Sequence, residues 1–385
     1  MDRSTGPSLG GRLAVLDLLR FGAAFAVLCV HYLTTHRGLW GKRGTEVFPE
    51  VAGAAQLGNL GVQLFFVISG FVILMSVQGR GVGDFAVSRV ARLFPAYWLS
   101  VAAFAVVYLA TSLASTSPRI GARDYLTNLT MMQAGVGAGN ADVVYWTLWV
   151  ELRFYVLVCL LAAVGATVRN TLGFMAGWLV VSVYAQAAGN ELLKVVFVPK
   201  HAPFFIAGMA FFLIHRYGSA LIPWGFVGVA WVLGMHQTVT FATDLQYDRV
   251  PHADFAVMAV ITAIFVLMGL VALGVFDRVR WRGLVVLGAL TYPLYLFHQL
   301  VAVLLVPALR PHLGRWGVFA VTAGAAVLLS YLVYRFAERP GQRFLRARLR
   351  ESLDRLRRES APATSVNPPP EQVPVIPEQA RVPVP

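Results

Sequence analysis

Two ionisable side chains in the first apolar segment, Arg20 and His31, have the spacing and the chemistry of a site. They are 11 positions apart, which corresponds to roughly 1100° of helix rotation, about 20° from whole turns, and to a rise of about 16 Å. Asp17 precedes Arg20 by one helical turn and can offset part of the cost of burying the guanidinium. An imidazole titrates near neutral pH and suits a general base, whereas a guanidinium suits phosphate. One helix face therefore combines a charge pair at one end with a candidate base at the other.

Other apolar segments also carry polar side chains or begin beside them. Because an ionisable or polar side chain inside a bilayer is costly, such residues are candidates for function. They are Ser69, Arg89, Arg92, Trp146, Glu151, Tyr292 and His298.

Each candidate has a structural explanation when it is considered alone. Ser69 precedes Gly70 and suits close helix packing, and Trp146 suits a membrane interface. Arg89 and Arg92 suit the anchoring of a span on the positively charged side of a membrane as well as they suit phosphate. The charge pair of the first segment can position a helix, and His31 can be an interfacial residue. Only the combination of these residues favours a site.

The elements that position these residues are predicted to be membrane-spanning helices. Hydrophobic residues make up 57% of the 385 residues and charged residues 13%, whereas soluble domains carry about 25% charged residues. Long apolar segments in lipid form helices, because every backbone polar group must be satisfied within the segment. We therefore predict an all-α, polytopic helical bundle with about ten spans. They lie at 13–33, 57–77, 93–112, 145–165, 171–189, 201–214, 221–236, 254–275, 284–306 and 316–336.

The distribution of basic residues predicts the orientation in the membrane. Leaving out Arg20 and Arg153 within the spans and counting Arg335 at the inner end of the last span, 20 of 30 Lys and Arg residues lie on the same side as the N-terminus, which identifies that side as cytoplasmic. We expect a multi-pass protein of the cell membrane with both termini in the cytoplasm. The net charge of +13 is thereby explained by topology, and no nucleic-acid partner is expected.

The sequence divides into a membrane domain, 1–340, and a tail, 341–385. The first part of the tail, up to Glu359, is basic and can form a helix at an anionic membrane surface. The rest contains eight prolines in 26 residues, which is typical of a disordered tether.

Taken together, the segments resemble the acyltransferase 3 family of membrane enzymes, which O-acylate carbohydrates and some macrolides. The resemblance runs from about Leu13 to Pro340. Single matches have modest specificity, and the joint order is specific. The matching positions are Asp17, Arg20, His31, the run Phe65–Phe71, Arg89, Arg92, Pro95, Tyr97, Trp146, Glu151, Phe154, Tyr155, Gly288, Tyr292, Tyr295, His298, Glu338 and Pro340. Trp149 and Thr291 depart from the family pattern, which bears on the acceptor more than on the reaction.

The resemblance implies transfer of an acyl group, acetyl in the simplest case, from acyl-CoA to a sugar-type hydroxyl. His31 is then the expected base, with Glu151 and Asp17 in supporting catalytic roles. Arg20, Arg89 and Arg92 are expected to bind the donor phosphates. Ser69, Trp146, Tyr292 and His298 are expected to line the substrate cavity. Acyl-CoA is a co-substrate, and neither a bound cofactor nor a metal is expected.

The alternative from another class is a transporter or flippase for a lipid-linked sugar, because buried charges also suit a permeation path. No internal repeat of the kind common in transporters is evident in the sequence. Motifs of other catalytic classes, among them a Walker loop and His-Glu-x-x-His, are missing.

Overall fold

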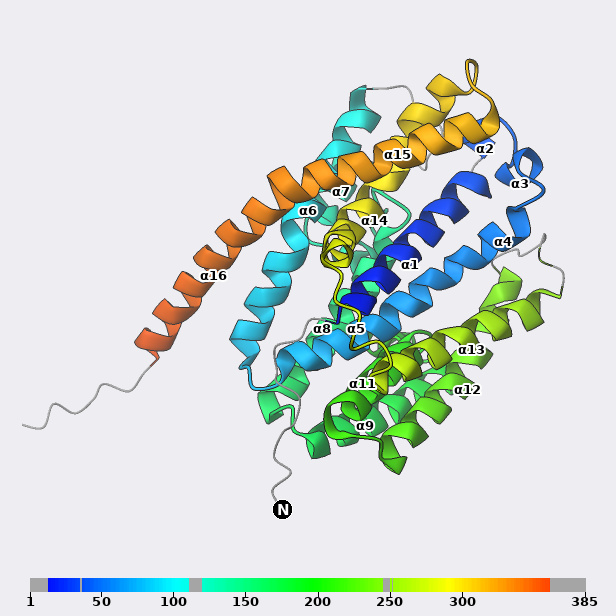
Figure 1. Ribbon diagram of the computed structural model, residues 1–385. Helices are drawn as coiled ribbons and strands as arrows, with labels where there is room; N and C mark the ends of the chain where they lie inside the picture. The colour runs from blue at the N-terminus through cyan, green and yellow to red at the C-terminus, as the bar shows by residue number, and fades with distance from the viewer. Residues whose placement is uncertain (1–12, 35–36, 111–119, 245–249, 251, 361–385) are drawn as a thin grey trace, which may run out of the picture.

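A computed structural model describes residues 13–34, 37–110, 120–244, 250 and 252–360. Within these residues the protein consists of helices and loops without strands, which confirms the predicted all-α class (Figure 1). The long helices are α1 (Ala14–Leu33), α5 (Gly61–Val77), α6 (Val82–Ala110), α8 (Tyr145–Val164), α9 (Val168–Ala187), α11 (Ala202–Tyr217), α12 (Leu221–Asp244), α13 (Ala253–Ala272), α14 (Arg282–Leu309), α15 (Arg315–Val333) and α16 (Arg339–Glu359). Shorter helices are α2 (Arg37–Trp40), α3 (Gly44–Val47), α4 (Ala52–Leu57), α7 (Ala122–Asn128) and α10 (Glu191–Phe197).

Each of the ten predicted spans overlaps a helix of the structure. Eight stretches among the described residues are long and apolar enough to cross a membrane. Two of the predicted spans, 171–189 and 221–236, lie in α9 and α12 and are not among these eight. The chain is therefore a multi-pass membrane protein.

The centre of the bundle is formed by α1, which lies between α14 and α5, and by α11, which crosses α5. The crossing of α5 and α11 brings two backbones into contact at Gly70 and Gly208. A Cβ atom at Gly70 would lie 2.1 Å from the carbonyl oxygen of Phe205, and one at Gly208 would lie 2.0 Å from that of Val67. Glycine permits this approach, as is common between membrane helices.

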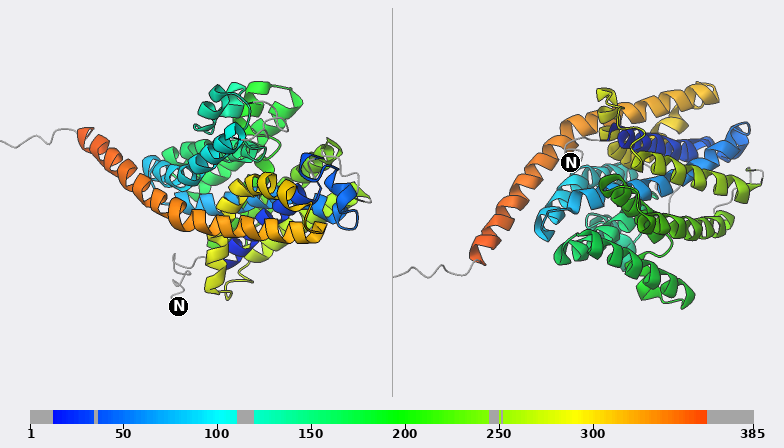
Figure 2. Two further views of the ribbon diagram at one scale, coloured as in Figure 1. Left: turned by 90° about the horizontal axis from the view of Figure 1, so that it is seen from above. Right: turned by 60° about the horizontal axis from the view of Figure 1, so that its bottom comes forward.

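The bundle has two chemically different ends. We call one the loop end: there Arg310, after α14, donates to the carbonyl of Leu39 over 3.2 Å, and Arg315 of α15 pairs with Glu50 at 2.6 Å. We call the other the arginine end: it contains the start of α1, the turn at 78–81 between α5 and α6, and α16 (Figures 1 and 2). His31 lies toward the loop end of α1 and Arg20 toward the arginine end.

The transition from α15 to α16 is a π-helical segment, Tyr334–Glu338. Figure 2 shows α16 following α15 directly, with a bend between the two helices. The segment 341–359, which we expected to be basic and helical, lies in α16, whereas the proline-rich part of the tail falls outside the described residues.

Candidate active site

Two histidines 267 positions apart meet in the interior of the bundle. Nδ1 of His31 on α1 lies 3.0 Å from Nε2 of His298 on α14. His298 is buried, and its Nδ1 lies 3.1 Å from the carbonyl oxygen of Leu294 and 2.9 Å from that of Tyr295. The two helices run in the same direction, so both imidazoles lie toward the loop end.

The hydrogen bonds of His298 determine how protons are distributed in the pair. Carbonyl oxygens only accept, so Nδ1 of His298 carries a hydrogen, and in the neutral ring Nε2 accepts. His31 must then donate from its Nδ1, and the nitrogen without a proton in neutral His31 is Nε2. This tautomer leaves Nε2 as the basic atom of His31.

Buried side chains fix the backbone around the histidine pair. The Tyr32 hydroxyl donates to the carbonyl of His298 over 2.7 Å, and Trp40 donates to the carbonyl of Tyr32 over 2.8 Å. The hydroxyl of Tyr295, one turn before His298, lies 2.8 Å from Oγ1 of Thr147 at the start of α8. Three helices and the α2 segment thus hold one pair of rings.

Glu151 belongs to a second group of polar residues. Its Oε1 accepts from Ser69 over 3.0 Å and from Tyr155 over 2.5 Å. Its charge acts on Arg20, together with the charges of Asp17 and Arg92. The hydrogen bonds of Glu151 therefore connect α5 and α8 beside Arg20 and do not go to a histidine.

Asp17 of α1 packs against α14 at Gly288. A Cβ atom at Gly288 would lie 2.3 Å from Oδ1 of Asp17, so the buried carboxylate occupies the space that a side chain on α14 would need. This contact explains the glycine at that position and fixes the first turn of α1 against α14.

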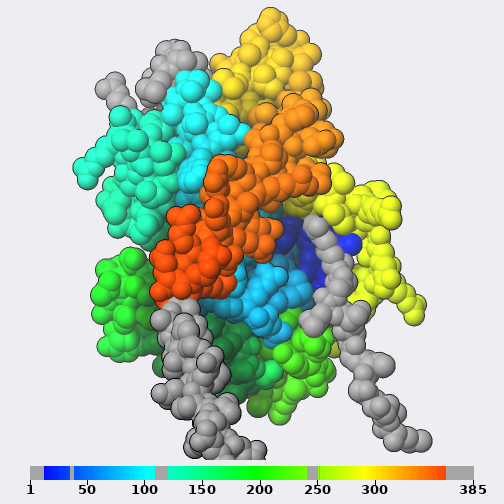
Figure 3. Space-filling view, turned by 90° about the vertical axis from the view of Figure 1, so that its left-hand side faces the viewer, coloured from blue at the N-terminus to red at the C-terminus, as the bar shows by residue number. Residues whose placement is uncertain are grey.

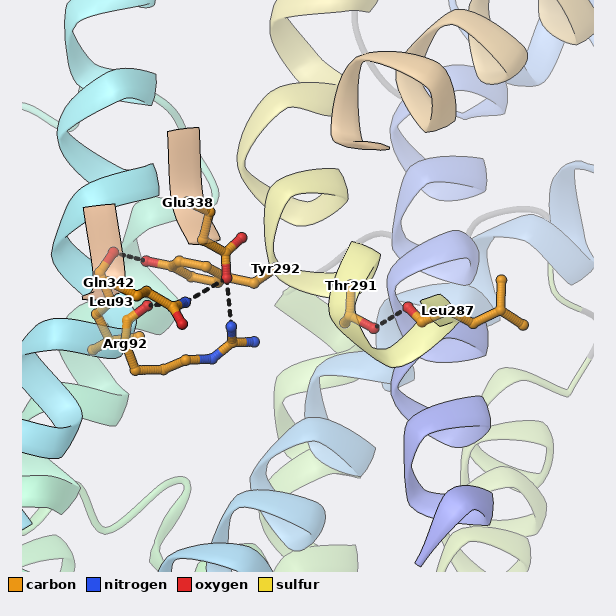
Figure 4. Close-up of polar contacts among 7 residues, drawn as sticks. All are labelled: Arg92, Leu93, Leu287, Thr291, Tyr292, Glu338 and Gln342. Carbon is orange, nitrogen blue, oxygen red and sulfur yellow. Dashed lines mark hydrogen bonds and ion pairs between the residues drawn. The ribbon is translucent and has the colours of Figure 1, made fainter. Parts of the chain in front are cut away.

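Arg92 has a carboxylate partner from the far end of the chain (Figure 4). It forms an ion pair with Glu338, which is fully buried in the π-helical segment and also accepts from Gln342 over 2.7 Å. Its guanidinium lies 5.7 Å from the ring centre of Tyr292, whose hydroxyl donates to the carbonyl of Leu93 over 3.0 Å. These contacts place Tyr292 at the junction of α6, α14 and α16.

Arg89 is partnered differently from Arg92. Its Nη2 donates to Ser88 over 2.9 Å, and its guanidinium lies 5.7 Å from the ring centre of Phe85 and 6.0 Å from that of Tyr155. Its Nε is buried without a hydrogen-bond partner. Through Tyr155, Arg89 adjoins the group around Glu151.

Comparison with known proteins identifies the family. The model of an acyltransferase domain, Acyl_transf_3, matches residues 13–335. The chain belongs to the acyltransferase 3 family. It is therefore an enzyme that transfers acyl groups other than amino-acyl groups, and the transporter alternative is set aside.

Two curated proteins are similar to this acyltransferase along most of their length. Nodulation protein 10 of Rhizobium leguminosarum bv. viciae is 28% identical over 358 residues, which cover 85% of this chain and 92% of the relative. Exopolysaccharide production protein ExoZ of Rhizobium meliloti (strain 1021) is 28% identical over 312 residues, which cover 76% and 92%. No solved structure gives a significant match.

The acyltransferase also contains polar residues that the sequence patterns did not single out. His201, at the start of α11, lies with its ring centre 5.4 Å from that of Trp146 and 5.1 Å from that of Phe66. Asp142, in the loop before α8, is buried, and its Oδ2 has no hydrogen-bond partner. Burial raises the pKa of Asp142 to about 7. A histidine at the start of a predicted span was the available signal for His201, whereas nothing in the loop sequence marks Asp142 as buried.

Thr291 has a local role in this structure. Its hydroxyl donates to the carbonyl of Leu287 one turn earlier, over 3.3 Å (Figure 4). The departure from the family pattern at this position is thus accommodated within α14.

Proposed function

We propose that this acyltransferase transfers an acyl group, acetyl in the simplest case, from acyl-CoA to a hydroxyl group of a sugar-type acceptor. One relative is named for exopolysaccharide production, which supports a cell-envelope polysaccharide or glycolipid as the acceptor. The observation that carries the proposal is the arrangement along α1: a histidine pair with a defined basic nitrogen at one end, and a guanidinium among acidic and aromatic groups at the other.

The proposed reaction uses the two ends of α1 together. The acceptor hydroxyl gives its proton to Nε2 of His31 while its oxygen bonds to the thioester carbonyl carbon. The carbon–sulfur bond then breaks, and the CoA sulfur receives the proton from His31. His298 accepts the hydrogen bond from Nδ1 of His31, which stabilises the ring when it becomes charged.

The distance along α1 fits a long donor that enters from the arginine end. Arg20 and His31 are separated by about 16 Å along the helix, too far for one to hold the other. The pantetheine arm of CoA can extend between them, with phosphates near Arg20 and Arg89 and the thioester near the histidines. Glu151, held by Ser69 and Tyr155, places a negative charge near Arg20.

Mass spectrometry of surface glycans and lipids from cells with and without the gene tests the proposal. We expect one acyl mass to disappear from a hydroxylated molecule and to return when the gene is restored. Restoration with the His31→Ala variant should not return it at comparable protein amounts. An unchanged set of acylated molecules would contradict the proposed reaction.

The proposed orientation has a separate test with single cysteines and an impermeant thiol reagent. Lys42 and Val136 are exposed at the loop end. They are better positions than the neighbouring Gly41 and Gly139, where a Cβ atom would lie 2.9 and 2.6 Å from other side chains. In whole cells, cysteines at positions 42 and 136 should react and one at Ser360 should not. Labelling at position 360 alone would place the arginine end outside and contradict a cytoplasmic donor.

A further inference from the structure

The helix α16 lies antiparallel along the first half of α6. A Cβ atom at Gly341 would lie 2.8 Å from Pro95, and one at Gly83 would lie 2.9 Å from Leu353. Near the end of α16, Arg357 pairs with Asp84 at 2.7 Å. In Figure 3, α16 in orange lies across one face of the molecule with blue and cyan surface beside it.

This docking brings arginines from three chain segments together. Arg346 of α16 lies within electrostatic range of Arg350 on the next turn and of Arg80, Arg89 and Arg92. Asp84 lies within range of Arg80 and Arg350 as well as Arg357. We call Arg80, Arg89, Arg92, Arg346 and Arg350 the arginine cluster.

The cluster carries more positive charge than its carboxylate neighbours neutralise. Of its five members, Arg92 alone forms an ion pair within the part of the chain that the structure describes, with Glu338. Nε of Arg89 is buried and has no hydrogen-bond partner. Like charges held this close repel one another, and an anion with several negative oxygens relieves that repulsion with charge-assisted hydrogen bonds. Phosphate groups carry several such oxygens and match the fork of an arginine side chain in bidentate geometry.

We propose that the donor-phosphate site expected at Arg89 and Arg92 extends onto α16, where Arg346 and Arg350 bind phosphate groups of the nucleotide part of the CoA donor. The inference rests on the proposed function, because it takes CoA as the donor. A series of contacts connects the cluster with the interior of the bundle. Arg89 lies over Tyr155, and Tyr155 donates to Glu151. The charge of Glu151 in turn acts on Arg20 of α1. A CoA donor with its phosphates bound at the cluster would thus extend past Arg20 toward His31.

The helix provides its own matched control. At about 100° per residue, Arg346 and Arg350 lie roughly 40° apart on one face, whereas Arg348 and Arg355 lie on the opposite face. The double variants R346Q/R350Q and R348Q/R355Q therefore remove the same charge from the same helix. Equal melting temperatures and elution volumes for both variants and the unaltered protein establish that all three are folded.

The experiment measures binding of CoA and of 3′-dephospho-CoA to the purified full-length protein in neutral phosphatidylcholine nanodiscs. For R346Q/R350Q we expect the dissociation constant for CoA to rise about 10-fold, since two charge-assisted contacts to phosphate are lost at a partly exposed site. R348Q/R355Q should stay within about twofold, because removed surface charge acts weakly at a distance. The unaltered protein should bind CoA more weakly as salt rises, with R346Q/R350Q less sensitive.

The inference is overturned if R346Q/R350Q binds CoA like the unaltered protein. If that variant also loses binding to phosphatidylglycerol vesicles, the cluster is assigned to lipid headgroups instead. The proposed function fails separately if the unaltered protein binds CoA but transfers no acyl group from acyl-CoA. No CoA binding by the unaltered protein would contradict both.

Discussion

The two ends of α1 are built on opposite principles. At the loop end, His31 and His298 lie 3.0 Å apart, and His298 is further held by two backbone carbonyls. At the arginine end, five guanidinium groups gather around few carboxylates, and a buried nitrogen of Arg89 has no hydrogen-bond partner. Proton transfer needs a ring in one orientation and one tautomer, which hydrogen bonds supply. Binding of an anion with several negative charges needs positive charge that is not neutralised by carboxylates, which the arginine cluster supplies.

The largest effect is expected at the loop end. His31→Ala removes the proposed base, so turnover should fall by about 10²–10⁴-fold while donor binding persists, because the arginine end is untouched. Single-turnover rates and CoA affinity of the purified variant check this. Wild-type turnover by His31→Ala would assign the base elsewhere, with His298 as the next residue to change.

A smaller effect is expected when only the orientation of the base is lost. His298→Ala removes the acceptor for Nδ1 of His31, and the loss of one charge-assisted hydrogen bond corresponds to about a 10- to 100-fold decrease in turnover. His298→Gln keeps a side-chain acceptor and should recover part of it. If His298 stabilises the charged ring of His31, the pH profile of turnover should shift in His298→Ala. A purely structural role of His298 would leave that profile unchanged. An unshifted profile would contradict the positioning role.

Asp142 predicts a pH effect on stability outside both groups. Its pKa of about 7 lies above the ordinary value of about 3.9. From about pH 4 to 7 the unfolded chain therefore loses this proton before the folded protein does, and the free energy of unfolding falls as pH rises. The loss is complete above about pH 7 and amounts to about 4 kcal/mol at most.

Asp142→Asn separates ionisation from hydrogen bonding at this position. Oδ1 of Asp142 accepts from the backbone of Val144 over 3.4 Å, and an asparagine keeps this acceptor. The variant should melt at a higher temperature than the unaltered protein at pH 8 and at a similar one near pH 4. The control is Asp124→Asn in the first turn of α7, which should leave the difference between the two pH values unchanged. Equal pH dependence in all three proteins would contradict a buried, titrating Asp142.

The smallest effect is expected beyond both ends. Truncation after Glu359 removes the proline-rich stretch and retains every residue of the histidine pair and the arginine cluster. Membrane insertion and turnover should therefore match those of the full chain. Normal insertion with lost turnover would give the removed stretch a role in substrate or partner binding.

Apolar segment lengths and polar motifs predict the helical class, the helix positions and most of the site residues. They do not predict which helices meet, because His31 and His298 are 267 positions apart and belong to segments that are each consistent with several neighbours. The same holds for the pairing of Arg92 with Glu338 and for the glycine at 288, whose reason is the carboxylate of Asp17. Asp142 was missed because a polar residue in a short loop is usually solvated, and only tertiary contacts bury it.

The π-helical segment at Tyr334–Glu338 determines which way the residues of α16 point around the helix axis. A π turn closes its hydrogen bond over one residue more than an α turn does, and one residue of helix corresponds to about 100° of rotation. A chain with the same number of residues that continued in plain α-helix would turn the Arg346 face of α16 away from α6 by about that angle. The lipid-facing side of α15 would not change. This short irregular segment thus allows the faces of the span and of the arginine-bearing helix to be oriented independently, although the two helices follow each other without a loop.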